Sequence, residues 1–116
     1  MKLKALRIAE LIKNTQGKRI AVIGDLMLDR YLMGSVSRIS PEAPVPIVDI
    51  KEEFTRFGGA ANVCLNLASL GAIAVPFGVL GLDSESNLFL DMAKHHSFSV
   101  DGVFQSETRI TTVKTR

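Results

Sequence analysis

The sequence lacks the features that define several large classes of protein. It has one cysteine, Cys64, so no internal disulfide can form and the chain suits a reducing compartment. No apolar run approaches the length of a membrane span, and Arg7, Glu10 and Lys13 interrupt any signal-peptide core near the amino terminus. The net charge of +2 gives no argument for binding nucleic acid or an anionic membrane. These absences favour a cytoplasmic protein with neither kind of partner.

Two nucleotide-binding motifs and a metal-binding pattern are also missing. The chain contains no Gly-x-x-x-x-Gly-Lys-Ser/Thr loop, and no Gly-x-Gly-x-x-Gly follows its first expected strand. His95 and His96 are adjacent, so they do not share a helix face, and no carboxylate or cysteine stands at metal-ligand spacing from them. We therefore expect no metal site and interpret both histidines as structural.

What is present is the composition of one small globular domain, 116 residues with 47% hydrophobic and 22% charged side chains. Amphipathic spacing predicts a helix over Leu3–Asn14. The apolar run Ile20–Ile23 is typical of a strand buried on both faces, as in a parallel sheet covered by helices. Gly24 and Asp25 would then lie at the carboxyl end of that strand, where ligands bind in open α/β sheets.

Two short segments, Met27–Gly34 and Val45–Phe54, are expected to pair as antiparallel strands. The residues between them are rich in turn formers, and Pro41, Pro44 and Pro46 would interrupt a ladder. This region is an insertion between the first strand and the next helix.

The stretch Phe57–Gly71 predicts a helix from about Ala60 to Leu70, with Gly71 as a left-handed cap. The Gly58-Gly59 pair permits close approach of a ligand to the backbone. A helix start behind it presents unpaired N–H groups to oxygen-rich or anionic ligands, and Asn62 adds an amide in the first turn. Taken alone, the same residues describe an ordinary loop that enters a buried helix.

The second half of the chain predicts three further elements. Ala72–Leu80 reads as a buried strand, in which Pro76 argues for an edge position or a bulge. Asp83 or Ser84 is suited to cap a helix that runs to about His96. A short strand is expected over Val100–Phe104, and the alternating residues from Thr108 to Arg116 predict a last strand with Thr112, Lys114 and Arg116 on one face.

Charged residues in these segments suit a sugar phosphate. Carboxylates such as Asp25 and Asp29 can accept hydrogen bonds from neighbouring hydroxyls, and arginines such as Arg30 and Arg38 suit phosphate. The alternatives are that Asp25 caps a turn, that Asp29 is solvated and that each arginine is a surface charge. Lys114 and Arg116 could likewise hold a phosphate or form an ordinary cationic strand face.

A resemblance to the first signature of the ribokinase-like (PfkB) carbohydrate kinases is carried by Gly58, Gly59, Ala60 and Asn62, and then by Gly71 and Gly81. Cys64 departs from that pattern, which usually has Ser, Thr or Ala there. The runs Gly24–Tyr31 and Ser37–Pro46 are similar to the heptose 7-phosphate kinases of this family. The resemblance covers residues 18–116.

The resemblance implies a ribokinase-like, Rossmann-type three-layer α/β sandwich, of which this chain is the N-terminal portion. It also implies a small β lid at about residues 27–56 that covers the sugar and supplies a homodimer interface. The implied substrate-binding residues are Asp25, Asp29, Gly58, Gly59 and Asn62. The implied candidates for phosphate binding are Arg30, Arg38, Lys114 and Arg116.

The family uses ATP and Mg²⁺, and its catalytic Asp belongs to a Gly-Ala-Gly-Asp signature that nothing in this sequence matches. We therefore expect the catalytic Asp and most of the nucleotide site beyond residue 116, and no phosphotransfer by residues 1–116 alone. The expected function is the sugar-binding part of a heptose 7-phosphate kinase. The alternatives are a kinase for another sugar or nucleoside, and a non-catalytic binding or dimerisation remnant.

Overall fold

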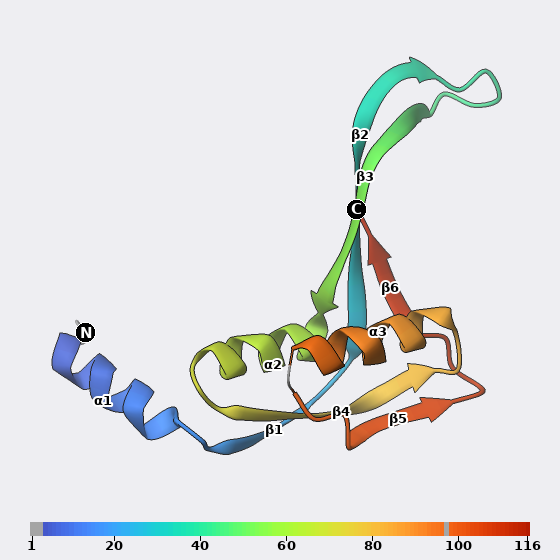
Figure 1. Ribbon diagram of the computed structural model, residues 1–116. Coiled ribbons are helices and arrows are strands. Elements are labelled where there is room, and N and C mark those ends of the chain that lie inside the picture. Colours follow the sequence, from blue (N-terminus) through green and yellow to red (C-terminus); the bar gives the residue numbers. More distant parts are fainter. Residues whose placement is uncertain (1–3, 97) are drawn as a thin grey trace.

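A computed structural model describes residues 4–96 and 98–116 of the chain (Figure 1). In these residues a parallel sheet is formed in the order β1-β4-β5, from Arg19–Ile23, Ile73–Gly81 and Gly102–Ser106. A second sheet has the order β3-β2-β6, from Pro46–Gly58, Leu26–Ile39 and Thr112–Thr115. The helices are α1 (Ala5–Thr15), α2 (Gly59–Ser69) and α3 (Ser84–His95).

The parallel sheet and its helices confirm the α/β prediction. Helix α2 leads from β3 into β4, and α3 leads from β4 toward β5, so each returns the chain to the start of a parallel strand. Both helices lie on the same face of the sheet (Figure 1). The described residues therefore contain the sheet and one helical layer of the sandwich.

Two predictions about the parallel sheet were wrong. Strand β1 is not buried on both faces: it lies at the edge of the sheet, and the Ile23 side chain is 83% exposed. Pro76 lies in the central strand β4 and not in an edge strand. Its position is tolerated because the ladder to β5 begins only at the next residue, Phe77, which pairs with Gly102.

A long hairpin of β2 and β3, here called the arm, projects from the body of the molecule (Figure 1). The predicted antiparallel pairing is confirmed, but β2 continues past Gly34 to Ile39 and β3 continues past Phe54 to Gly58. Pro46 was expected to interrupt the ladder, and this was wrong, because it pairs with Ile39 at the end of the hairpin. The radius of gyration is 18.6 Å, against about 13 Å for a compact chain of this length. The arm is a large part of that difference.

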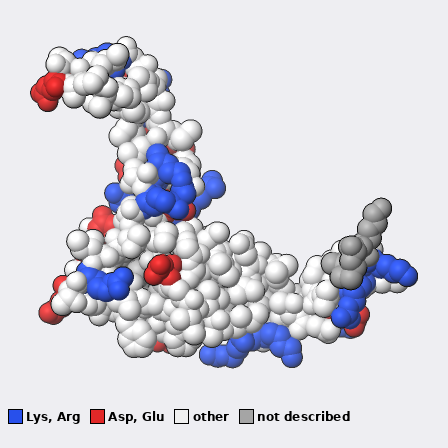
Figure 2. All heavy atoms as spheres, turned by 180° about the vertical axis from the view of Figure 1, so that it is seen from behind, with Lys and Arg blue, Asp and Glu red and all other residues white. Residues whose placement is uncertain are grey.

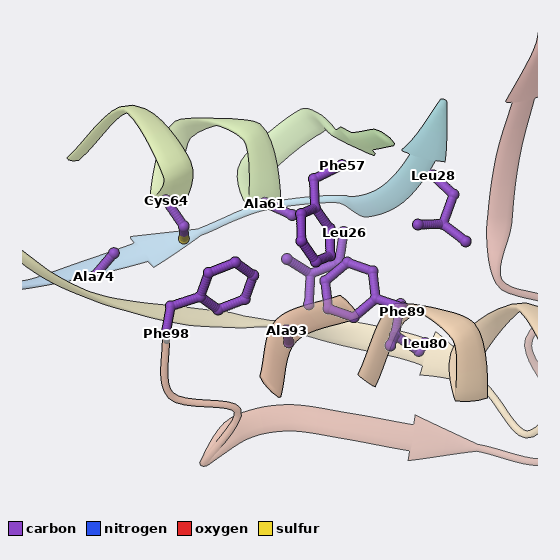
Figure 3. Packing of buried hydrophobic residues seen from close by; sticks show 10 residues of the cluster. All are labelled: Leu26, Leu28, Phe57, Ala61, Cys64, Ala74, Leu80, Phe89, Ala93 and Phe98. Carbon is purple, nitrogen blue, oxygen red and sulfur yellow. The ribbon is translucent and has the colours of Figure 1, made fainter. Parts of the chain in front are cut away.

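The hydrophobic core lies where the base of the arm, α2, α3 and β4 meet. Its aromatic centre is Phe57, whose ring packs edge-on against Phe89 at a centroid distance of 4.8 Å and in a tilted arrangement against Phe98 at 5.1 Å. Figure 3 shows these rings between helices and strands, with the remaining members around them: Leu26, Leu28, Ala61, Cys64, Ala74, Leu80 and Ala93. The core therefore joins the arm to the body.

Helix α1 confirms the amphipathic prediction, although the predicted first residue, Leu3, lies outside the described residues. No side chain within α1 is buried, and Leu6 is 86% exposed. The helix lies to one side of the sheet (Figure 1). None of the described helices is long and apolar enough to cross a membrane.

Candidate functional site

The arm and β6 bring basic and acidic side chains into one row. In the sheet register Asp29 of β2 pairs with Arg56 of β3 on one side and with Lys114 of β6 on the other. Residues paired in this way point to the same face of a sheet. Two residues further along β2, Tyr31 pairs with Phe54, and Arg116 lies next to Tyr31 with its guanidinium carbon 5.4 Å from the ring centroid.

This face borders a hollow of about 380 Å³, within the usual size of small-molecule sites. The hollow lies between the base of the arm, α2 and the end of α3. It is lined by Asp29, Tyr31, Thr55, Arg56, Phe57, Asn62, Leu65, Met92 and His96. Basic side chains gather where the arm meets the body (Figure 2).

Asp29 is the electrostatic centre of the row. Its carboxylate oxygen lies 3.2 Å from the Lys114 ammonium and 3.1 Å from the Arg116 guanidinium, and its side chain is 16% exposed. Partial burial raises the pKa of Asp29, but the two cations outweigh it and hold the pKa below the ordinary value. Asp29 therefore stays ionised at neutral pH and anchors both cations beside the hollow.

The start of α2 requires glycine at positions 58 and 59, because neighbouring atoms leave no room for a side chain there. Gly59 has φ of 54°, and a Cβ atom there would lie 2.3 Å from the Asp25 carbonyl oxygen. That same carbonyl accepts a hydrogen bond from the Ala60 N–H at 2.9 Å, so the turn is closed against the end of β1. At Gly58 a Cβ atom would come within 3.1 Å of the Asp29 carboxylate. The glycines let the start of α2 approach the arm.

Two of the five residues predicted to bind the sugar, Asp29 and Asn62, line the hollow. Gly58 lies against Asp29, and Gly59 forms the first residue of α2. The side chain of Asp25 is exposed at the carboxyl end of β1, where it was expected, but it does not line the hollow. Their role in binding stays a prediction.

The four candidate phosphate-binding residues separate into two groups. Lys114 of β6 and Arg116, one residue past its end, point to the same face, as the alternation predicted, and both contact Asp29, although the strand begins at Thr112 and not at Thr108. Arg30 points to the opposite face of β2, where its guanidinium contacts Glu53 and Glu85, each at 3.4 Å. Arg38 is exposed in the outer half of the arm, paired with Ile47. Phosphate binding by any of the four remains a prediction.

Sequence reasoning did not assign the other seven residues that line the hollow to the site, among them Tyr31, Arg56 and His96. Tyr31 stands two residues after Asp29, so strand alternation alone could have placed both on one face. Arg56 and His96 carried no such signal, because their positions depend on the β2–β3 register and on the packing of α3. The His96 ring packs edge-on against Phe57 at 5.6 Å, which agrees with its predicted structural role.

The fold of this chain is shared with solved sugar kinases. A fructokinase from Halothermothrix orenii matches with a TM-score of 0.61 at 27% identity, over 84% of this chain and 32% of that one. A putative ribokinase from Agrobacterium tumefaciens matches with a TM-score of 0.67 at 17% identity, over 85% of this chain and 31% of that one. The fold is therefore ribokinase-like.

The chain belongs to the pfkB family of carbohydrate kinases, whose family model matches residues 17–116. Among curated proteins, the bifunctional protein HldE of Helicobacter acinonychis is 50% identical over 99 residues, or 85% of this chain and 21% of that protein. The HldE of Methylobacillus flagellatus is 50% identical over 97 residues, or 84% of this chain and 20% of that protein. The chain spans about a fifth of the length of these relatives.

Proposed function

We propose that this chain is the sugar-binding, N-terminal part of an ATP-dependent kinase that phosphorylates D-glycero-β-D-manno-heptose 7-phosphate at its anomeric hydroxyl. The product would feed ADP-heptose and lipopolysaccharide core synthesis, as the family resemblance implies. The observation that carries the proposal is the identity of about half of all aligned residues with bifunctional HldE proteins, together with the motif runs Gly24–Tyr31 and Ser37–Pro46.

The geometry supports the substrate class. A seven-carbon sugar phosphate needs hydroxyl-binding groups and cations in one place. Asp29 and Asn62 supply an acceptor and an amide inside the hollow, and Lys114 and Arg116 are held beside it by Asp29. In this proposal Asp25, Gly58 and Gly59 complete the sugar site at the start of α2, and Arg30 and Arg38 are further candidates for phosphate contact.

ATP and Mg²⁺ belong to the proposal through the family, and a fructokinase from Xylella fastidiosa with bound ATP shares the fold with a TM-score of 0.64. Residues 4–96 and 98–116 include no cluster of three or more His, Cys, Asp or Glu side chains that could hold a metal ion. The proposal assigns the catalytic Asp and most of the nucleotide site to the part of the kinase that this chain does not span, and expects no turnover by this chain alone.

The test of the substrate is calorimetric titration of heptose 7-phosphate into the protein and its Asp25→Ala and Asn62→Ala variants. We expect binding by the unchanged protein and its loss in both variants. Asp101→Ala serves as control, because Asp101 is exposed in the turn before β5. Tighter binding of ribose or fructose would indicate a kinase for another sugar. A chain that is folded by circular dichroism and binds no sugar would indicate a remnant.

We also propose that the outer part of the arm forms a homodimer interface in the kinase. Its strands expose several large apolar side chains, and an exposed apolar surface of this kind is typical of a protein interface: Met33, Val36, Ile39, Val48 and Ile50. Sedimentation should show a dimer, and Val48→Asp should convert it to a monomer. A monomer at every concentration of the unchanged protein would contradict this part of the proposal.

A further inference from the structure

The side chain of Arg56 rests on an aromatic surface at the edge of the hollow. Tyr31 and Phe54 stack with centroids 4.9 Å apart and planes inclined by 11°. The Arg56 guanidinium carbon lies 5.1 Å from the Phe54 centroid and 5.8 Å from the Tyr31 centroid. A cation above aromatic rings is attracted by them without using up its N–H groups as hydrogen-bond donors, so the five N–H donors of Arg56 can still bind an acceptor.

Arg56 differs from the neighbouring cations in what it contacts. Lys114 and Arg116 are within ion-pair distance of Asp29, and Arg30 is within that distance of Glu53 and Glu85. Within residues 4–96 and 98–116, no carboxylate comes within 4 Å of the Arg56 guanidinium. Its charge is therefore the least compensated of the cations on this face.

The charges on this face favour an anion. Arg56, Lys114 and Arg116 carry three positive charges, and two carboxylates share the face: Asp29 beside them and Glu52, which lies further out, two residues from Phe54 along β3. The remaining positive charge suits a phosphate monoester, which carries about −1.5 to −2 charges at neutral pH. A planar guanidinium can contact two phosphate oxygens at once, whereas an ammonium contacts them as a point charge.

We propose that Arg56 is the residue that recognises the phosphate group of the sugar phosphate substrate, held for this task on the Tyr31–Phe54 stack. Lys114 and Arg116, fixed by Asp29, complete the positive surface on the other side of Tyr31. This inference rests on the proposed function, because it assigns a specificity-determining contact to that same sugar site. It predicts that Arg56 distinguishes phosphorylated from unphosphorylated sugars.

The experiment compares the affinities of the protein for heptose 7-phosphate and for unphosphorylated heptose, by calorimetry at fixed ionic strength. Arg56→Gln should weaken binding of heptose 7-phosphate by about 10- to 100-fold, the effect of one hydrogen-bonded charge contact. Its affinity for unphosphorylated heptose should stay within about twofold of the original, because no sugar contact is changed. Arg56→Lys should give an intermediate loss for the phosphorylated sugar, because it keeps the charge without the two-pronged geometry.

Arg19→Gln is the matched control, because Arg19 is an exposed arginine on β1 that does not line the hollow. It should leave both affinities unchanged, and thermal melting should show all variants folded. Equal losses for both sugars in Arg56→Gln would overturn the inference and indicate a structural role in the arm. An unchanged preference for the phosphorylated sugar in Arg56→Gln would also overturn it, and would leave the proposed function standing.

Binding of a second ligand, fructose 6-phosphate, distinguishes failure of the proposed function from failure of the inference about Arg56. If the unchanged protein prefers fructose 6-phosphate to heptose 7-phosphate, and Arg56→Gln removes that binding, the heptose substrate is wrong and the role of Arg56 stands. If the unchanged protein binds neither sugar phosphate, both proposals are overturned.

Discussion

The carboxylate of Asp29 and the guanidinium of Arg116 meet at 3.1 Å although about three quarters of the chain separates them in sequence. The contact exists because β6 joins the arm in parallel with β2, in a register that pairs Asp29 with Lys114. Arg116 then continues beside β2, with its N–H donating to the Arg30 carbonyl at 2.9 Å. The last residues of the chain thus complete the cationic face of the arm.

Replacing Asp29 by asparagine should weaken this junction. The substitution keeps the shape but removes the charge that holds Lys114 and Arg116, so the two cations repel each other. We expect the thermal midpoint to fall by a few degrees, and to fall further at low ionic strength, where repulsion is less screened. Asp49→Asn, on the same hairpin, should change the midpoint little, because Asp49 is exposed and an amide oxygen can still accept its hydrogen bond from the Ser37 hydroxyl. An Asp29→Asn midpoint that does not depend on salt would contradict this account.

Gly59→Ala should be strongly destabilising. The left-handed conformation costs a residue with a side chain about 1–2 kcal/mol, and the new Cβ atom would meet the Asp25 carbonyl. We expect a loss of about 2 kcal/mol or more, measured by urea unfolding. Gly24→Ala is the control, because its Cβ atom would meet only the Ala60 side chain, at an ordinary 3.4 Å. Equal unfolding midpoints for the two variants would show that the turn can relax.

Features that depend on a few neighbouring residues were predicted correctly from the sequence. The helix expected at Ala60–Leu70 is Gly59–Ser69, and Gly71 has the left-handed φ of 85° expected of its cap. Asp83 caps α3 as expected, since the residue types of a cap are local. The family signature also lies within one continuous stretch, so it could be read without knowledge of the tertiary structure.

Features that depend on distant partners were not predicted. Pro76 argued for an edge position or a bulge, but it lies in the central strand β4 with no shift of register, because the ladder to β5 begins only at Phe77. The pairing of Arg56 with Asp29 depends on the register of a long hairpin with two irregularities, between Met33 and Gly34 and between Val36 and Arg38. His96 lines the hollow only because α3 packs against Phe57. A single sequence does not contain this information in local form.

Phe89→Ala should remove much of the stability of the chain. The Phe89 side chain is fully buried and packs edge-on against Phe57 at the centre of the core (Figure 3). Truncation of such a ring costs about 3–5 kcal/mol, a large fraction of the stability of a typical domain. Phe104→Ala, at a site that is 63% exposed, should cost far less. Chemical denaturation of both variants measures the difference, and similar losses would contradict the assigned core.

Asp83 should make the stability of the chain depend on pH in the acid range. Its carboxylate accepts the Thr111 N–H at 2.8 Å and the Ser86 N–H at 2.8 Å, so it joins the start of α3 to the residue before β6. These hydrogen bonds hold the pKa of Asp83 below its ordinary value of 3.8, and the bond from Thr111 has the larger effect. Because the folded state has the lower pKa, the unfolded state binds more protons as the pH falls.

The stabilisation by Asp83 is therefore complete well above pH 3.8 and is lost as the pH falls through that value to the pKa of the folded state. Asp83→Asn should lower the melting temperature at pH 7 by several degrees, because an amide oxygen is a weaker acceptor for two backbone N–H groups. The difference between the two proteins should shrink as the pH is lowered toward 3. Asp101→Asn, in an exposed turn, should follow the unchanged protein throughout. A difference that stays constant from pH 7 to pH 3 would show that the charge of Asp83 does not hold α3 to β6.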